Sequence, residues 1–368
     1  MTRLVIDARL ASHSGIGTYL AELLPRVLHR LAAWRPLVLC THANQSRLET
    51  SIGTAAPCAV WNVAPLSVGD LLSTPPGVGP HDLLWTPHFN VPLRSDCALA
   101  VTLHDLLPLT APALAGYGRS LPVRAWLRAI STRARTVLCV SEFTRGEALR
   151  LSDLDPARVQ VTPLGVDRAW FAGDVAAARP DPSVPPTMIF VGLLKPHKNV
   201  PRLLRAFMQV QDRIAHRVVL VARHRDVRNV DREALALARK LGDRVELVQD
   251  LPFAELVARV KAAEFAVQPS LHEGFGLPAL EAMAAGTPVL AGRAGALPEV
   301  CGNAALYCDP ASEDDIARAL LLLATDTALR TRLAAAGRER AHAFSWDACA
   351  ATTALALSAA LRVLEHPP

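Results

Sequence analysis

The sequence has few cysteines, few lysines and no long apolar run, and each scarcity excludes a class of protein. Its seven cysteines form no CxxC pair and show no zinc-site spacing, which is typical of reduced thiols in a cytosolic protein. Asp7 follows the N-terminus closely, so we expect no signal peptide. No stretch of about eighteen strongly apolar residues appears, so we expect no membrane span. We predict a cytoplasmic protein and interpret residues 348–364 as a packed helix.

The net charge is modest and lysine is rare. A charge of +5 suits an acidic ligand or an anionic membrane surface but does not require nucleic acid. With 51% hydrophobic and 20% charged residues the chain should fold as a globular protein, and 368 residues are enough for two domains. Only four of the 39 basic residues are lysines, so a lysine at a candidate site carries weight; they are Lys195, Lys198, Lys240 and Lys261.

Short apolar segments alternate with helical or irregular stretches along both halves of the chain. This alternation is typical of a parallel sheet covered by helices. We expect buried strands at 3–7, 36–40, 83–85, 99–103 and 136–140 in the first half, and at 187–192, 217–222, 244–248, 265–270 and 288–292 in the second.

The stretch 172–186 separates the two halves. It is rich in proline and alanine and lacks periodicity, which indicates a linker. We therefore predict an α/β fold with an N-terminal Rossmann-like domain over 1–171 and a C-terminal one over 187–345. A last helix over 346–368 is expected to pack back toward the N-terminal domain.

Residues 271–290, LHEGFGLPALEAMAAGTPVL, combine a glycine-rich loop with the start of a helix. Pro278 suits the first turn of a helix, and Gly286 suits the position that ends one. A helix N-terminus attracts anions through unpaired N–H groups and the helix dipole. The amides expected at this end belong to Phe275, Gly276 and Leu277, with Gly274 just before them.

Two glutamates flank that loop and lie eight positions apart, Glu273 and Glu281. An anionic diphosphate held at the helix end would have its sugar near Glu273 and its ribose near Glu281. The alternative is a solvated loop glutamate and a second one that only favours the helix dipole. The residue pattern alone leaves both readings open.

Two further loops follow predicted strands in the first half. GIGTYL (15–20) places Gly15 and Gly17 before a helix, where glycine allows a ligand to approach the backbone. It is not a GxGxxG fingerprint, and a plain tight turn is the alternative. His104 and Asp105 follow a strand directly, where ligands bind in open α/β sheets, although a local structural hydrogen bond would explain them too.

Together these segments resemble family-4 retaining glycosyltransferases. The likeness rests on the two glutamates with GFGLP between them, on GALPEVCGNAALYCDP (295–310) and on segments in the family's order: GIGTYL, LHDLLPL (103–109), VSEFTRGEAL (140–149), VTPLGVD (161–167) and FVGLLKPHKN (190–199). The resemblance implies two Rossmann-like domains that face each other across a cleft, the GT-B arrangement. It also implies transfer of a sugar from a nucleotide sugar with retention, as in bacterial mannosyl- and rhamnosyltransferases of surface polysaccharide synthesis.

The resemblance assigns roles to single residues. It places the donor diphosphate and sugar at 271–286, with Glu281 on the ribose hydroxyls and Glu273 beside the transferred sugar. Lys198 would pair with the diphosphate, and His104 would contact the donor sugar. The loop with Gly15 and Gly17 would face the donor phosphate and the acceptor.

One position departs from the family pattern. Many relatives carry an arginine directly after the strand glycine, and this chain has Leu193. Lys195 or Arg223 could supply the second cation. Asn199 is expected to cap the helix that follows, with Pro201 in its first turn.

The sequence also bears on cofactors and on alternative functions. We found no acidic pair placed to hold a metal–diphosphate complex and no metal-ligand spacing around His272, so we expect no metal or other cofactor. The donor guess is GDP-mannose; dTDP- or GDP-deoxysugars and UDP-sugars are alternatives. The rivals are a nicotinamide oxidoreductase and a non-catalytic binding protein, and we expect no nucleic-acid partner.

The segment 117–135 is basic and contains aromatic residues. Arg119, Arg124, Arg128, Arg133 and Arg135 occur with no acidic residue between Asp105 and Glu142. A basic helix with Trp126 as its anchor could attach peripherally to an anionic membrane, where a lipid-linked acceptor would be met. The alternative is an ordinary amphipathic helix with Trp126 in the core.

Overall fold

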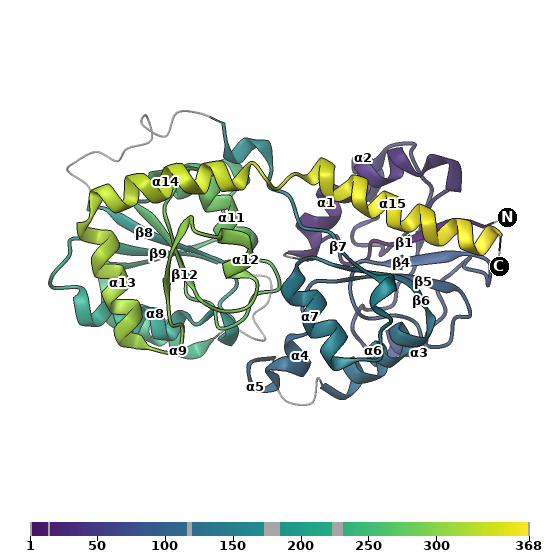
Figure 1. The fold of residues 1–368 in the computed structure, drawn as a ribbon, viewed down its shortest axis with the longest axis horizontal. Coiled ribbons are helices and arrows are strands. Elements are labelled where there is room, and N and C mark those ends of the chain that lie inside the picture. The colour runs from purple at the N-terminus through teal and green to yellow at the C-terminus, as the bar shows by residue number, and fades with distance from the viewer. Residues whose placement is uncertain (1, 14, 116–119, 173–184, 223–230, 367–368) are drawn as a thin grey trace. The chain divides into compact units, whose positions relative to one another are not determined.

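The computed structural model describes residues 2–13, 15–115, 120–172, 185–222 and 231–366 (Figure 1). The chain forms two compact units: residues 1–165 together with 345–368, and residues 166–344. Most of the predicted linker, 173–184, lies outside the described residues. Each unit is an α/β structure built on a parallel sheet, so the prediction of two Rossmann-like domains is confirmed.

The sheet of the first unit has seven strands in the order β3-β2-β1-β4-β5-β6-β7, and all their pairings are parallel. The strands are β1 (Leu4–Asp7), β2 (Leu37–Cys40), β3 (Cys58–Val60), β4 (Leu83–Thr86), β5 (Ala98–Leu103), β6 (Ala134–Cys139) and β7 (Val159–Val161). The helices are α1 (Ile16–Arg30), α2 (Gln45–Ile52), α3 (Val68–Leu72), α4 (Leu107–Thr110), α5 (Pro112–Ala115), α6 (Ser120–Arg133), α7 (Glu142–Leu151) and α15 (Trp346–Glu365).

The sheet of the second unit has six parallel strands in the order β10-β9-β8-β11-β12-β13. They are β8 (Thr187–Val191), β9 (Arg217–Ala222), β10 (Val245–Gln249), β11 (Phe265–Gln268), β12 (Val289–Gly292) and β13 (Ala305–Cys308). The helices are α8 (Val200–Val210), α9 (Arg232–Leu241), α10 (Phe253–Ala262), α11 (Leu277–Ala284), α12 (Leu297–Cys301), α13 (Glu313–Thr325) and α14 (Thr327–Ala341).

The strand order of each sheet reverses at one point. In the first unit the chain runs outward from β1 to β3 and then returns to the other side of β1 with β4. In the second unit the same reversal separates β8 from β11. The connections after the two strands therefore leave in opposite directions and open a crevice at their carboxyl ends, which is where ligands bind in such sheets.

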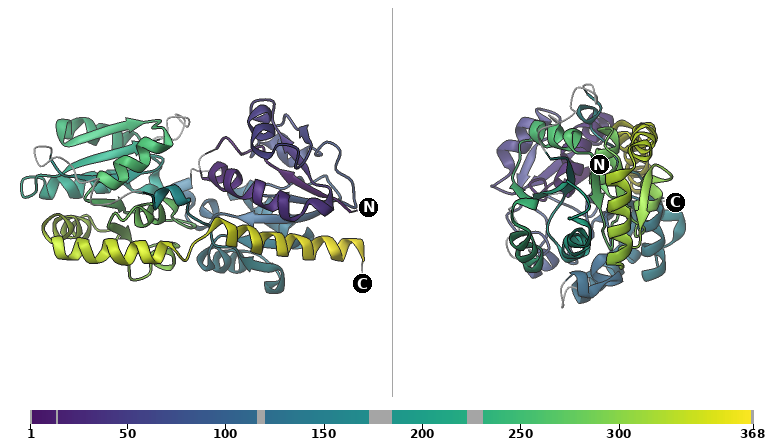
Figure 2. Two further views of the ribbon diagram at one scale, coloured as in Figure 1. Left: turned by 90° about the horizontal axis from the view of Figure 1, so that it is seen from above. Right: turned by 90° about the vertical axis from the view of Figure 1, so that its left-hand side faces the viewer.

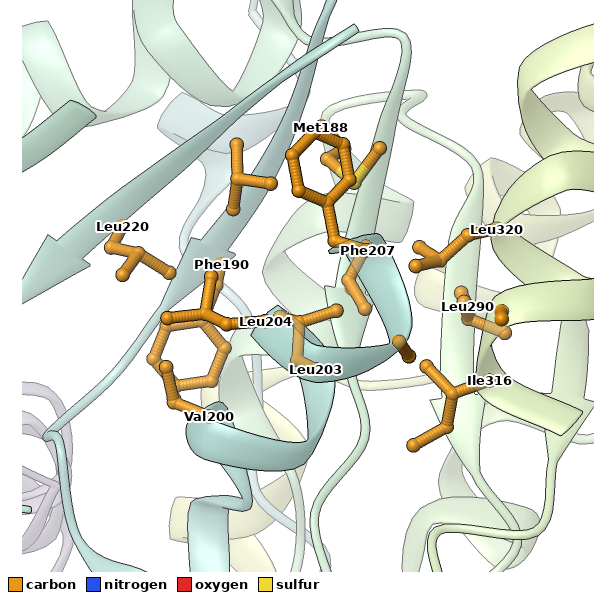
Figure 3. Close-up of a cluster of buried hydrophobic side chains, with 14 of the residues drawn as sticks. Met188, Phe190, Val200, Leu203, Leu204, Phe207, Leu220, Leu290, Ile316 and Leu320 are labelled. Atoms are coloured by element: carbon orange, nitrogen blue, oxygen red, sulfur yellow. The ribbon is translucent and has the colours of Figure 1, made fainter. Parts of the chain in front are cut away.

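The core of the second unit lies between α8 and its sheet. Leu203, Leu204 and Phe207 on α8 are fully buried, and they pack in one cluster with Phe190 of β8 and Leu220 of β9 (Figure 3). Their spacing of one and three or four residues places them on one face of the helix. This packing fixes the start of α8, and with it the loop that follows β8.

The last helix belongs to the first unit. Figure 2 shows α15 running beside α1, and Arg26 of α1 pairs with Asp347 at 3.1 Å. A side chain at Gly165 would lie 2.1 Å from the backbone nitrogen of Trp346, so only glycine allows this contact. The stretch Thr327–Glu365 is long and apolar enough to cross a membrane by length and composition. Its residues 348–364 form the packed helix predicted from the sequence, because Cys349, Ala350, Leu357 and Leu361 are buried.

Candidate active site

The reversal point of the second sheet brings together a lysine and a glutamate that are 75 residues apart. Lys198 lies in the loop after β8, and Glu273 lies in the loop after β11. The Lys198 Nζ donates to both carboxylate oxygens of Glu273, at 2.6 Å to Oε1 and 2.8 Å to Oε2. Both side chains are largely buried, with 14% and 10% of their surfaces exposed. The structure thus places two sequence-predicted residues in direct contact.

Glu273 carries a negative charge at neutral pH. Burial alone would raise the pKa of its carboxyl group, but the charge and hydrogen bond of Lys198, together with His197 and Ser270, hold the pKa below its usual value. The hydroxyl of Ser270 donates a further hydrogen bond to Oε1 at 2.8 Å. An ionised carboxylate accepts hydrogen bonds and stabilises positive charge, but it has no proton to donate.

Asn199 holds the two loops together. Its backbone adopts a left-handed conformation at φ 64°, and its side-chain amide donates to the carbonyls of Pro269 at 2.9 Å and Pro310 at 2.7 Å. Asn199 occupies the N-cap position of α8, but its side chain makes no capping hydrogen bond. The predicted N-cap position is therefore confirmed, while the side chain binds the buried carbonyls of neighbouring loops instead of capping the helix. Pro201 lies in the first turn of α8, as predicted.

The helix after Glu273 begins and ends as the sequence predicts. Gly276 is its N-cap at φ 100°, and no side chain caps it. A side chain at Gly276 would lie 2.6 Å from Leu297. Gly286, at φ 77°, ends the helix: its N–H donates to Met283, and the next N–H donates to Ala282. Without a capping side chain, the start of α11 keeps backbone donors for an anion.

The other residues of the predicted donor site lie in the loop before α11 and in α11 itself. Gly274 and Phe275 are buried, and the ring of Phe275 packs edge-on against Phe344 at 5.7 Å. Leu277 is the first residue of α11 and is half-buried. Glu281 lies one turn into α11, also half-buried.

The sequence reading missed the residue that supports Glu273 from behind. A side chain at Gly295 would lie 2.5 Å from the Glu273 carbonyl oxygen, and the backbone at Gly295 has φ 59°. The next residue, Ala296, donates its N–H to that oxygen at 2.9 Å. GALPEV marked this segment only as part of a resemblance; its contact with Glu273 depends on tertiary packing.

Two residues are candidates to replace the family arginine. Lys195 is half-buried and precedes the short 3₁₀ turn Pro196–Lys198. Arg223 lies outside the described residues.

In the first unit the glycine loop leads into α1. Gly15 has φ 72°, and a side chain at Gly17 would lie 2.7 Å from the Ala11 carbonyl oxygen. The Gly17 N–H donates to His13 at 2.9 Å. The backbone itself thus requires both glycines, as expected for a tight turn.

His104 is neutral in this structure and its tautomer is fixed. Its Nε2 lies 3.0 Å from the carbonyl oxygen of Pro87, which can only accept, so Nε2 carries the proton. Burial lowers the pKa of His104 to about 4, against a smaller opposite effect of Asp105. The Nδ1 atom is therefore a hydrogen-bond acceptor. Asp105 itself accepts from the Leu107 N–H at 3.0 Å, which is the local structural role considered above.

The described residues contain no group of three or more His, Cys, Asp or Glu side chains arranged to hold a metal ion. The triplet Asp153-Leu154-Asp155 has the spacing of a metal–diphosphate motif, and the sequence reading passed over it. Asp155 is exposed and accepts from the Ala157 N–H at 2.9 Å, immediately before β7. It therefore lies at the amino end of a strand, opposite to the edge where the candidate residues lie.

The exposed face of the segment predicted to contact a membrane does not include Trp126. Trp126 is 4% exposed and packs against Phe89 with ring centroids 5.8 Å apart, so it belongs to the core. Its role as an anchor is wrong, because the apolar face of α6 covers the sheet. Arg124 and Arg128 are exposed, and Leu121 is 75% exposed. Tyr117 and Arg119 lie outside the described residues.

Comparisons with known proteins cover both units. Residues 176–340 match the family "Glycosyl transferases group 1", and residues 80–170 match "Glycosyltransferase Family 4". The chain is 30% identical over 277 residues to O-antigen chain mannosyltransferase B of Escherichia coli, covering 73% of this chain and 71% of that protein. It is 33% identical to the MMP alpha-(1->4)-mannosyltransferase of Mycolicibacterium hassiacum, covering 69% and 64%. The sucrose-phosphate synthase structure from Thermosynechococcus elongatus superposes with a TM-score of 0.79 at 21% identity, covering 99% of this chain and all of that one.

Proposed function

We propose a reaction for this chain from the premise that it belongs to the glycosyl transferases of group 1 and is therefore a glycosyltransferase. It transfers a hexose from a nucleotide diphosphate sugar to a glycan or lipid-linked oligosaccharide, with retention of the anomeric configuration. GDP-mannose is the first candidate donor, because two relatives are named mannosyltransferases. Synthesis of a surface polysaccharide is the proposed context.

The observation that carries this proposal is the Lys198–Glu273 pair at the reversal point of the second sheet. A buried ammonium at the carboxyl end of β8 can neutralise charge that develops on a departing diphosphate, and electrostatic stabilisation of this kind usually contributes most to catalysis. The uncapped start of α11 adds backbone donors. The ionised Glu273 stabilises positive charge on the sugar and accepts hydrogen bonds from the sugar's hydroxyl groups.

The remaining steps use the donor and the first unit. The acceptor hydroxyl attacks from the side of the leaving group, and a donor phosphate oxygen takes its proton as the diphosphate departs. Glu281 binds the ribose hydroxyls. His104 accepts a hydrogen bond from a sugar hydroxyl through Nδ1, because its Nε2 proton is directed to Pro87. Gly15 and Gly17 allow substrate to approach the backbone of their loop.

The test is a thermal-shift series with GDP-, UDP-, dTDP- and ADP-sugars, followed by NMR of the product. The true donor stabilises the native state by mass action, and we expect GDP-mannose to raise Tm most. An α-linked product from an α-linked donor would support retention. If no nucleotide sugar raised Tm or was consumed, the proposal would be wrong. A best response to a UDP-sugar or a deoxysugar donor would change the donor but not the reaction class.

We also propose that turnover requires no metal ion. Lys198 and the α11 amides supply the positive charge that a metal would otherwise provide. Activity should persist in EDTA, and loss on chelation with recovery on Mg²⁺ or Mn²⁺ would overturn this part.

The enzyme is proposed to work in the cytoplasm, at the inner face of the membrane where a lipid-linked acceptor would lie. Leu121, Arg124 and Arg128 form the exposed face of α6, and Arg135 is exposed just beyond it. An exposed leucine among arginines favours an anionic lipid surface even without a tryptophan anchor.

A further inference from the structure

The first unit has its own reversal point, between β1 and β4. Asp7 is the last residue of β1, and His88 lies two residues beyond the end of β4. Both residues therefore lie at or just beyond the carboxyl ends of neighbouring strands, which is the edge of an open α/β sheet where ligands bind. Neither residue has a role in the reaction described so far.

A buried ionic cluster lies on the β1 side of this point. Arg9 donates to both oxygens of Asp7, at 2.9 Å and 2.6 Å, and pairs with Asp70 at 2.8 Å. It also donates to the carbonyl of Val63, and its guanidinium lies 3.4 Å from the ring centre of Trp61. Arg9 is therefore fully engaged, and the carboxylates of Asp7 and Asp70 face it.

His88 lies against this cluster without a hydrogen-bond partner. It is 2% exposed, and neither of its ring nitrogens is hydrogen-bonded to any described residue. Its Nε2 is 3.7 Å from Asp7 Oδ2, which is too far for a hydrogen bond. Buried polar groups are nearly always paired, so a side chain with two unpaired nitrogens requires an explanation.

The charge of His88 is fixed by its surroundings. Burial lowers the pKa of its imidazole to about 3, partly opposed by Asp7, and Arg9, His104 and His13 lower it further. At neutral pH the ring is uncharged, with one donor and one acceptor nitrogen.

A ligand at this point must therefore be small and neutral. The surplus carboxylate of the Asp7–Arg9–Asp70 cluster disfavours a phosphate or a carboxylate, and no cation remains to bind one among the described residues of the cluster. Because His88 is only 2% exposed, no group larger than one such as a hydroxyl could reach its ring. A hydroxyl can both donate to and accept from a neutral imidazole.

We propose that His88 binds a hydroxyl group of the acceptor, and that the reversal point of the first unit selects an acceptor sugar that is uncharged at this position. The inference rests on the proposed glycosyl transfer and adds to it a specificity-determining residue and an acceptor class. Nothing in the donor site of the second unit depends on it.

The test compares His88→Phe, which removes both nitrogens, with His88→Gln and His88→Asn, which each keep an amide. His81→Gln is the matched control, because His81 is an exposed histidine of the same unit. The probes are the methyl glycosides of mannose, glucose and galactose and their 6-phosphates. Three quantities are measured: binding by saturation-transfer NMR, KM for the glycoside with the nucleotide sugar that is consumed, and slow hydrolysis of that donor by water.

We expect a neutral glycoside to bind the wild-type chain and the matching 6-phosphate to bind less. His88→Phe should raise KM for the neutral glycoside by about tenfold, the loss of one hydrogen bond. Donor hydrolysis reports separately on His104, which the neighbouring Pro87 holds in place, and it should fall by less than KM rises. His88→Gln or His88→Asn should recover part of the loss, and His81→Gln should match the wild type.

An unchanged KM in a folded His88→Phe variant would overturn the proposal, as would a 6-phosphate that binds better than its neutral partner, or no neutral glycoside binding at all. If His88→Phe fails to fold, His88→Leu, which also lacks ring nitrogens, takes its place: a folded His88→Leu with the wild-type KM would overturn the proposal. Failure of the proposed sugar transfer can be distinguished from failure of the His88 proposal. In that case the wild type would hydrolyse no nucleotide sugar, while NMR could still report glycoside binding.

Discussion

Lys198 and Glu273 are joined by two hydrogen bonds of 2.6 Å and 2.8 Å between one ammonium and one carboxylate. In the proposed reaction they serve different parts of one donor, Lys198 the diphosphate and Glu273 the sugar. Donor binding must therefore exchange part of this ion pair for contacts with the donor. Breaking a buried pair leaves the other charge uncompensated, so a donor that supplies only one of the two contacts binds poorly.

Replacing Glu273 by Gln should lower turnover and leave nucleotide affinity at least as high as in the wild type. The amide cannot stabilise positive charge on the sugar, and kcat should fall by about a hundredfold. Lys198 loses its competing carboxylate and is more available to the diphosphate. Calorimetric titration with the nucleoside diphosphate measures the second effect, with Glu255→Gln, an exposed glutamate of the same unit, as control. A tenfold weaker nucleotide affinity in Glu273→Gln would contradict this assignment.

Replacing Glu281 by Ala should weaken nucleotide binding, unlike Glu273→Gln. A carboxylate that accepts from the ribose hydroxyls contributes roughly 1.5–3 kcal/mol, so nucleotide binding should weaken by that amount. The substitution keeps a good helix former within α11, so the fold should be unaffected. The same titration decides, and equal nucleotide affinity in wild type and Glu281→Ala would remove the ribose role.

Folding stability should fall with acid in part because of His88. In the unfolded chain this histidine binds a proton near pH 6.5, whereas burial lowers its folded pKa to about 3. Below about pH 6.5 the unfolded state therefore binds more protons than the folded state. The free energy of unfolding should fall as the pH drops from about 6.5 toward about 3, because in that range His88 is protonated only in the unfolded chain. Urea midpoints should fall less steeply with acid in His88→Gln than in the wild type. His81→Gln, at an exposed site, should keep the wild-type slope; equal slopes in all three would refute the prediction.

Binding to membranes should depend on Arg124 and Arg128 of α6 and on the exposed Arg135 of β6. Changing Arg124, Arg128 and Arg135 to Gln should reduce co-sedimentation with anionic liposomes, because each arginine near such a surface contributes about 1 kcal/mol. Binding should also weaken with salt. The control changes Arg30, Arg94 and Arg362, three exposed arginines elsewhere in the same unit. If both triple variants sedimented like the wild type, this face would not be the contact.

Much of the fold could be read from the sequence because its central strands are continuous apolar runs. Strands such as 217–222 were placed to the residue, since a strand buried on both faces shows an unbroken hydrophobic segment. The edge strands β3, β7 and β13 were missed. Each has only three or four residues and is partly exposed, so it carries no comparable signal.

The loops of the candidate site could be predicted from the sequence, but the contacts between them could not. Glycine and proline positions gave the start and end of α11, because those conformations depend on local backbone chemistry. The pairing of Lys198 with Glu273, and of Arg9 with Asp70, joins residues far apart in the chain and depends on sheet order. The burial of Trp126 had been left open, since helical spacing shows which residues share a face but not what covers it.

The most direct test of the account is the release of nucleoside diphosphate from the nucleotide sugar that the wild type consumes, measured for Lys198→Met. Lys240→Met is the control, since Lys240 is an exposed lysine on α9 of the same unit. The account predicts that Lys198→Met loses about a hundredfold in kcat while Lys240→Met retains wild-type turnover. Equal release by wild type and a folded Lys198→Met would contradict the claim that the reversal point of the second sheet is the donor site.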